Sequence, residues 1–507
     1  MKRRTFLRSS LGAAAAASLP FPDRLEAALV DRAFRPVSKA PADLRAITGA
    51  GREITLTSKA VADLAARLKG RVLVAGDDGY DGARMILNPS FDKRPALIAQ
   101  VTGAADIRAA VDFARGNDGL LLAVKCGGHS FSGKSTCDMG MMIDLSGFRD
   151  VRVDPIAQRA RVTGGSLLGN LDHEAMAYDL VVPMGTVSHT GVGGLVTGGG
   201  FGRLARRFGL AVDNLVSVDV VSADGEFRRA NAEENPDLFW GVRGGGGNFG
   251  VVTSFEFQLN RMQRRVLGGQ IMFPISMVRE VLALYGDYGP VAPDELQLDC
   301  AIVLPPGGAP GLAGFAICYS GPPSQADRVL DPIRKLGTPL MDTVQGVDYV
   351  ALQRSGDTDD FRATASYMKS GFVSDISSGL ADAIADGIEG HPQRNTQMVF
   401  QHAGGAIDRV PEGETAFAQR GELANMLCMV GWPHPMDGSE HIAWIREYWP
   451  SLEPFTRGFY TNDLDPNATS ESINANYRSN FNRLVAVKNR YDPDNLFRLN
   501  ANVQPSV

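Results

Sequence analysis

Three glycine-rich tracts, each beside an apolar run, constrain this chain more than any other feature. The first is Gly127-Gly128-His129-Ser130, which follows the apolar run 120–124. That run predicts a buried strand. Adjacent glycines let the backbone turn sharply and approach a ligand closely, and successive exposed N–H groups form a concavity that suits phosphate. The alternative interpretation is an ordinary turn beside a packed histidine. The other two tracts are therefore needed to support a ligand site.

The second tract runs from residue 182 to residue 202 and the third from residue 244 to residue 252. Neither has the Gly-x-Gly-x-x-Gly spacing at a helix start, with an acid about twenty residues on, that marks nicotinamide dinucleotide sites. A nicotinamide-dependent enzyme is therefore the disfavoured interpretation. The glycine tracts still predict turns whose backbone N–H groups can bind phosphate.

With 507 residues the chain is long enough for two or more domains. Its net charge of −6 and the lack of a basic stripe give no electrostatic case for nucleic acid. The five cysteines are scattered and lack metal-ligand spacing, so we expect no metal site. Buried free thiols are the expected state, with one disulfide as the alternative.

The first 28 residues predict a targeting segment. Lys2-Arg3-Arg4 opens a twin-arginine n-region, and the alanine-rich stretch 11–19 is too short to span a bilayer. Twin-arginine export carries proteins that have already folded, which suits an enzyme that must acquire a bulky cofactor. We therefore expect a periplasmic or secreted protein without stable membrane insertion. A basic, frayed N-terminus with an amphipathic helix is the alternative.

Element patterns predict an α+β protein of two parts. In the first part, 96–101 and 120–124 are expected strands, 104–115 an expected helix, and 164–177 a second helix. A domain boundary is expected near Arg261. Beyond it, strand-like runs at 268–273, 296–304, 315–319, 397–401 and 424–431 alternate with amphipathic helices. This second part, 262–454, should be an antiparallel cap domain, and 455–507 should return to the first domain, 44–261.

The three tracts, in this order, resemble the flavin-binding module of the vanillyl-alcohol oxidase and p-cresol methylhydroxylase superfamily. The nearest branch is the berberine bridge enzyme-like oxidases. The terminal segment Tyr491-Asp492-Pro493-Asp494-Asn495-Leu496-Phe497 is similar to the signature that completes the flavin domain in that branch. The resemblance runs from about Tyr80 to the C-terminus. It implies an FAD-dependent oxidoreductase that takes hydride from an alcohol, sugar or related C–H donor.

The resemblance also implies which residues contact FAD. His129 occupies the position joined covalently to the flavin ring, and a neutral imidazole is a competent nucleophile for that bond. Many relatives carry a second link through a cysteine where this chain has Val187, so we predict a single link. The expected cofactor-binding residues are Gly127, Gly128, His129, Ser130, Gly133, Gly185, Ser188, His189, Gly193, Gly194, Gly198, Asn248, Gly250, Val252, Tyr460, Asn462, Asn500 and Asn502.

The catalytic base has two candidates by the same resemblance. Asp408 matches the tract in which berberine bridge enzyme places its carboxylate, and Asp463 stands where many relatives have a tyrosine. Hydride removal needs a group that takes the hydroxyl proton, and two neighbouring acids could share one. Tyr460 is a further candidate for the site. Gln397, Val399 and Gln401 lie at strand period, so one face of that run is expected to meet the substrate.

Three alternatives stay open at this point. Within enzymes, the chain is either an oxidase that uses oxygen or a dehydrogenase or oxidative cyclase that uses another acceptor. Outside enzymes, it is a flavin-free binding protein on the same fold. Substrate identity and oligomeric state are not predicted.

Overall fold

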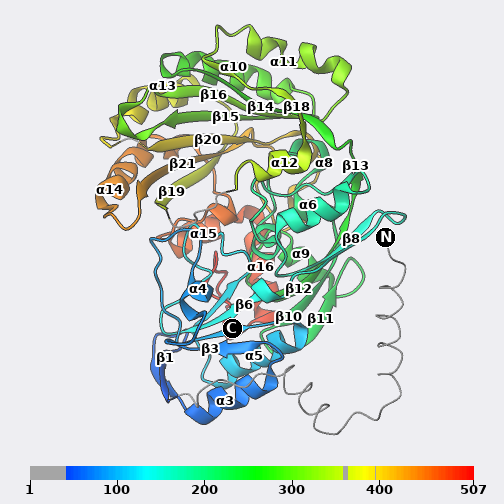
Figure 1. Ribbon diagram of the computed structural model, residues 1–507, viewed down its shortest axis with the longest axis vertical. Coiled ribbons are helices and arrows are strands. Elements are labelled where there is room, and N and C mark those ends of the chain that lie inside the picture. The colour runs from blue at the N-terminus through cyan, green and yellow to red at the C-terminus, as the bar shows by residue number, and fades with distance from the viewer. Residues whose placement is uncertain (1–41, 358–362, 394, 507) are drawn as a thin grey trace, which may run out of the picture.

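The computed structural model describes residues 42–357, 363–393 and 395–506, so the predicted targeting segment lies outside the described residues. Figure 1 shows two stacked parts, with a broad antiparallel sheet at the top and smaller sheets with the C-terminal helices below it. This arrangement confirms the predicted α+β class. Across the described ranges, none of the helices combines the length and apolar character needed to cross a bilayer.

A four-stranded sheet carries the first glycine tract. Its order is β3 (Arg71–Leu73), β4 (Leu97–Gln100), β6 (Met141–Asp144) and β5 (Leu122–Lys125), and β6 runs parallel to both β4 and β5. Helix α5 (Ala104–Gly116) makes the crossover from β4 to β5 and packs beside α3 (Ser58–Arg67). Ligands of parallel sheets lie beyond the carboxyl ends of the strands, which is where β5 delivers Gly127 and Gly128.

A five-stranded antiparallel sheet carries the third tract. Its order is β11 (Phe227–Ala230), β10 (Leu215–Ser222), β12 (Gly250–Gln258), β8 (Arg159–Thr163) and β7 (Val151–Asp154). A hydrophobic core joins this sheet to α6 (Leu168–Met176), α7 (Val192–Thr197), α9 (Pro236–Val242) and α16 (Phe481–Tyr491). The C-terminal helix α16 therefore packs in the core of the first part, beside α9, which lies more than 200 residues earlier in the chain.

The upper part is one antiparallel sheet of eight strands. The path is β17 (Met341–Asp342), β14 (Arg265–Pro274), β16 (Leu312–Tyr319), β15 (Leu296–Leu304), β20 (Thr396–His402), β21 (Ala424–Pro433) and β19 (Thr364–Val373), with β18 (Gln345–Asp348) beside β14. Four helices share its core: α10 (Val278–Tyr288), α11 (Ala326–Arg334), α13 (Ser378–Gly387) and α14 (Ser439–Tyr448). In Figure 1, α10, α11 and α13 lie above the sheet, so its other face turns toward the lower part. We call this part the cap.

Two elements differ from expectation. Helix α6 begins at Leu168 rather than residue 164, because the Gly164 N–H still donates to the Thr253 carbonyl oxygen of β12, and both glycines lie against neighbouring backbone. A Cβ on Gly164 would lie 2.1 Å from the Val252 carbonyl oxygen, and one on Gly165 would lie 1.9 Å from that of Leu145. Strand β19 was not among the expected strands, although all ten of its residues pair with β21.

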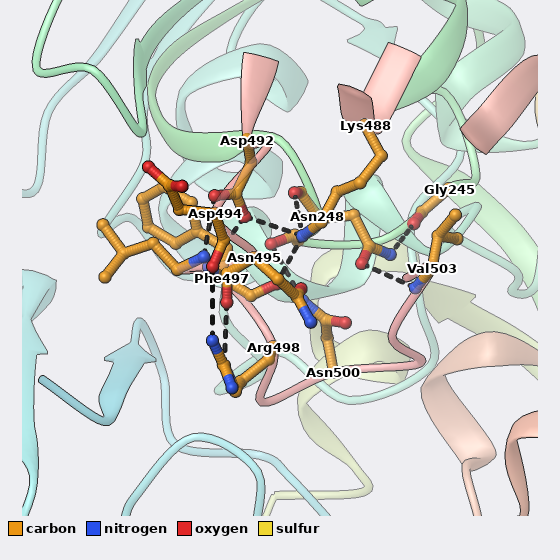
Figure 2. A network of polar contacts seen from close by, with 12 residues as sticks. Gly245, Asn248, Lys488, Asp492, Asp494, Asn495, Phe497, Arg498, Asn500 and Val503 are labelled. Carbon is orange, nitrogen blue, oxygen red and sulfur yellow. Dashed lines mark hydrogen bonds and ion pairs between the residues drawn. The ribbon is translucent and has the colours of Figure 1, made fainter. Parts of the chain in front are cut away.

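The C-terminal segment is tied to the third glycine tract by a buried polar network (Figure 2). The Lys488 ammonium donates to the carbonyl oxygens of Asn248 and Phe497, at 2.9 and 3.0 Å, and to the Asp492 carboxylate at 2.7 Å. That carboxylate also accepts the backbone N–H groups of Leu496 and Phe497. The network holds the terminal signature in one conformation.

Replacing Lys488 with methionine should lower the free energy of unfolding by about 3–5 kcal/mol, because it leaves a buried carboxylate without its cation. Both side chains of the pair are fully buried. Urea unfolding followed by circular dichroism measures the change. Arg490→Met is the matched control on the same helix, since the Arg490–Asp237 pair is partly exposed and should contribute no more than about 1 kcal/mol. Equal losses in the two variants would contradict this assignment.

Candidate active site

A cavity of about 420 Å³ lies among the three glycine tracts, the C-terminal segment and three strands of the cap. Its size is within the range of small-molecule and cofactor pockets, roughly 300–1,000 Å³. Most of the predicted site residues line it. They are Gly127, Gly128, His129, Ser130, Gly185, Gly193, Gly194, Gly250, Val252, Tyr460, Asn462, Asp463 and Asn500.

Open glycine positions and an unpaired amide oxygen show that this cavity suits a large polar ligand. A Cβ on Gly194 would meet no atom within 4 Å, and one on Gly247 would meet only the Asn500 amide nitrogen, at 3.9 Å. The side-chain oxygen of Asn500, which lines the cavity, is buried and has no hydrogen-bond partner among the described residues. A buried acceptor of this kind is normally satisfied, so it points to a donor group on a ligand. These features fit a flavin dinucleotide.

His129 lies at the start of the loop after β5, and its ring lines the cavity. Gly128 precedes it with a φ of +71°, a conformation that glycine adopts without strain. Burial, reinforced by the nearby charge of His189, lowers the pKa of His129 to about 4. The two histidine rings are 5.1 Å apart. The imidazole is therefore neutral and nucleophilic at physiological pH.

Ser188 and His189 contact the cap rather than the cavity. The Asp357 carboxylate accepts the Ser188 hydroxyl at 2.5 Å and the backbone N–H groups of Ser188 and His189 at 3.0 and 3.3 Å. A protein carboxylate thus occupies the anion-binding turn that the resemblance assigned to FAD. The contact joins the second glycine tract to the chain after α12 (Tyr349–Arg354).

Four other predicted residues lie behind the cavity wall. The Asn248 amide donates to the Gly245 and Ala501 carbonyl oxygens and accepts from the Val503 N–H. A Cβ on Gly133 would collide with the Phe91 ring, and one on Gly198 would lie 2.3 Å from the Asn462 amide oxygen. Asn502 also falls outside the lining residues. These residues shape the wall by packing.

Asp463 is the acid that the structure brings to the cavity. It ends a short 3₁₀ turn, Thr461–Asp463, and accepts a hydrogen bond of 2.8 Å from the Asn425 amide. Burial raises the pKa of Asp463 to about 6, and the Asn425 hydrogen bond works against that rise. Within the described part of the chain, burial and the Asn425 hydrogen bond are the influences on the Asp463 carboxyl, and no charged side chain is among them. A carboxyl with this pKa can take up a proton near neutral pH.

The Tyr460 ring lines the cavity, but its hydroxyl is held by the protein. The phenol oxygen accepts from the backbone N–H groups of Gly200 and Phe201, at 3.0 and 3.2 Å, and from the Asn462 amide at 2.7 Å. Burial raises the pKa of Tyr460 to about 12. Tyr460 therefore forms part of the cavity wall and anchors the second glycine tract. Its occupied hydroxyl and high pKa argue against a role as the base.

Asp408 is not among the residues that line the cavity, contrary to the role that the resemblance implied for it. After β20, Gly404 and Gly405 both adopt left-handed φ values, of +84° and +60°, and a short 3₁₀ turn follows. The Asp408 carboxylate instead accepts the Gly421 N–H at 2.9 Å. The sequence match identified this segment, but the path of the chain after Gly404 and Gly405, which keeps Asp408 out of the cavity lining, is seen only in the structure.

Sequence reasoning missed most of the cap wall. Gln401 was on the predicted strand face and does line the cavity, but Met368, Leu427 and Met429 were not singled out. Leu427 and Met429 lie at strand period on β21, so alternation along that strand was the signal that could have found them. Met368 pairs with Met429 across β19 and β21. Its strand was not predicted.

Comparisons with known proteins agree with this site. Residues 95–231 match the family described as "FAD binding domain". Residues 460–504 match the family described as "Berberine and berberine like". An FAD-linked oxidoreductase of Dictyostelium discoideum is 31% identical over 86% of this chain and 95% of its own length. The (R)-6-hydroxynicotine oxidase of Paenarthrobacter nicotinovorans is 30% identical over 86% of this chain and 97% of its own length.

Solved structures extend the likeness. The 6-hydroxy-D-nicotine oxidase of Arthrobacter nicotinovorans superimposes with a TM-score of 0.79 at 28% identity, covering 87% of this chain and 98% of that one. A chitooligosaccharide oxidase, at 23% identity, shares the fold with the same TM-score of 0.79 and covers 88% of this chain and 100% of that one. The matches run through both parts and through the C-terminal segment that closes the cavity. The chain therefore belongs to the berberine bridge enzyme-like family of FAD-linked oxidoreductases.

Proposed function

We propose that this enzyme takes a hydride from an alcohol or a related C–H donor, with FAD joined by a single bond to His129 and Asp463 as the base. One observation carries the proposal: the same cavity holds a neutral imidazole and a half-buried acid with a pKa of about 6. When bound, FAD supplies the two-electron acceptor for the hydride and returns the electrons to oxygen or another acceptor.

The chain's own residues would divide the remaining work. Gly127, Gly128, Gly194 and Asn500 would hold the cofactor against the first part, and His129 would anchor it. As the substrate C–H bond breaks, the hydrogen leaves with both electrons, and Asp463 takes the hydroxyl proton, so that the carbinol becomes a carbonyl. Val187 lines the cavity where relatives with two links have cysteine, and its isopropyl group cannot form a thioether.

The test uses the purified full-length protein. A yellow colour that stays with acid-precipitated protein supports the covalent flavin, and bleaching on anaerobic addition of a donor supports hydride transfer. Peroxide formation on re-admission of air indicates an oxidase, and its absence indicates a dehydrogenase. A colourless protein would contradict the proposal and favour a flavin-free binding protein.

We also propose export through the twin-arginine route, on the strength of Lys2-Arg3-Arg4 and the short apolar stretch after it. Replacing Arg3 and Arg4 together with lysine should retain the protein inside the cell, because lysine keeps the charge but not the guanidinium geometry. Cell fractionation followed by immunoblotting measures the periplasmic or secreted share. An unchanged share in the double variant would argue against this route.

A further inference from the structure

One buried amide orients two polar groups at the cavity, Gln401 in the cap and Asp463 in the C-terminal segment. Asn425 is fully buried on β21, directly opposite Gln401 on β20. Its NH₂ group donates to the Gln401 side-chain oxygen and to the Asp463 carboxylate, each at 2.8 Å. An ionised carboxylate only accepts hydrogen bonds, so Asn425 must present its NH₂ to Asp463. Its second hydrogen then requires Gln401 to present its oxygen to Asn425.

This orientation leaves the Gln401 NH₂ group as a donor at the cavity. Gln401 lines the cavity, and its NH₂ group has no acceptor within the described residues. The Asp463 carboxylate, which accepts from the same Asn425 amide, has no ion-pair partner among the described residues. The cavity therefore has a hydrogen-bond donor from the cap, Gln401, beside a proton acceptor from the C-terminal segment, Asp463, and the Asn425 amide orients both. Asn425 itself is a positioning residue, because it does not line the cavity.

Among the described residues, the other cap side chains that line the cavity are apolar. Met368, Leu427 and Met429 lie beside these two groups on β19 and β21. An oligosaccharide placed there would press several hydroxyl groups against methionine and leucine side chains, and each hydroxyl without a partner is costly to desolvate. A substrate with an apolar body and few heteroatoms has no such desolvation cost at this wall, and burial of its apolar surface favours binding.

We propose, on the basis of the function proposed above, that the substrate is a compact alcohol or amine with an apolar body and one hydrogen-bond acceptor near the oxidised carbon. Asp463 takes the proton, and the Gln401 NH₂ group binds the acceptor. Gln401 is thus the residue that determines specificity, and sugars are poor donors for this enzyme.

The experiment follows flavin bleaching anaerobically in the holoenzyme with three probes. 1-(Pyridin-3-yl)ethanol and 1-phenylethanol have nearly the same shape and differ by one ring acceptor, and xylobiose represents sugars. We expect kcat/KM to be about tenfold higher for the pyridyl alcohol than for the phenyl alcohol, as one hydrogen bond predicts. Xylobiose should be slower than both.

Two variants of Gln401 test the donor itself. Gln401→Met keeps the length but removes the donor, together with the oxygen that accepts from Asn425. The pyridyl preference should disappear, while 1-phenylethanol still bleaches the flavin. Gln401→Glu replaces the donor with an acceptor, so the preference should reverse. Gln397→Met, on the same strand but outside the cavity lining, is the matched control and should keep the preference of the unmodified enzyme.

The outcomes separate the two proposals. Fastest bleaching by xylobiose, no bleaching by either aromatic alcohol, or equal kcat/KM for the pyridyl and phenyl alcohols would overturn the substrate class while a covalent, reducible flavin still supported the enzyme. A pyridyl preference that survives in Gln401→Met would overturn the role of Gln401. A protein that carries no flavin would overturn both proposals.

Discussion

Replacing His129 with alanine should abolish the covalent attachment of flavin completely. The imidazole is the nucleophile in the proposed bond, and its low pKa, about 4, keeps it neutral near pH 7. In the unmodified protein, the flavin should stay with the acid-precipitated polypeptide. In His129→Ala, the precipitate should be white, with any yellow colour in the supernatant.

Intact-mass analysis and peptide mapping give the second readout for His129. The peptide that contains His129 should carry the mass of one FAD, and no other peptide should. His189→Ala is the discriminating control, because its ring lies 5.1 Å from that of His129 and lines no part of the cavity. That variant should retain the covalent flavin. A retained link in His129→Ala, or its loss only in His189→Ala, would show that the anchor has been assigned to the wrong histidine.

The second large effect is expected at Asp463. Asp463→Asn should lower kcat by about 10²–10⁴-fold, which is the usual contribution of a positioned general base. A base works only in its ionised form, and burial sets the pKa of Asp463 at about 6. Activity should therefore rise with pH through about 6 and reach a plateau above it. Steady-state rates between pH 4.5 and 9 measure this profile.

Asn425→Leu tests whether the rise of activity with pH, the acidic limb of the profile, reports the ionisation of Asp463. The Asn425 hydrogen bond favours the charged carboxylate and so lowers its pKa. Its removal should raise that pKa and move the limb to higher pH, so the variant loses most activity near pH 6 and least at alkaline pH. A purely structural loss would lower the rate equally at every pH.

Asp408→Asn is the matched control for the choice of base. Burial also raises the pKa of Asp408, but its carboxylate accepts the Gly421 N–H and does not line the cavity. The variant should keep the position of the pH limb and most of kcat. Loss of activity in Asp408→Asn with little change in Asp463→Asn would reverse the assignment.

The amino-acid sequence by itself determined the family, the α+β class and the first glycine turn. Those features are local: the apolar strand before Gly127 and the glycine pair are contiguous in the chain, and each tract carries its conformational preference with it. His129 could be placed at the cavity for the same reason. The terminal signature was recognisable because it too is one continuous segment.

Only the tertiary structure decided which acid faces the cavity. The sequence left both Asp408 and Asp463 as candidates. In the structure Asp408 follows two left-handed glycines and stays outside the cavity lining, while Asn425, on a strand 38 residues earlier in the chain, donates a hydrogen bond to Asp463. The capture of Ser188 by Asp357 and the pairing of Gln401 with Asn425 likewise join residues far apart in the sequence. Such contacts depend on how strands align and domains dock, which no local pattern encodes.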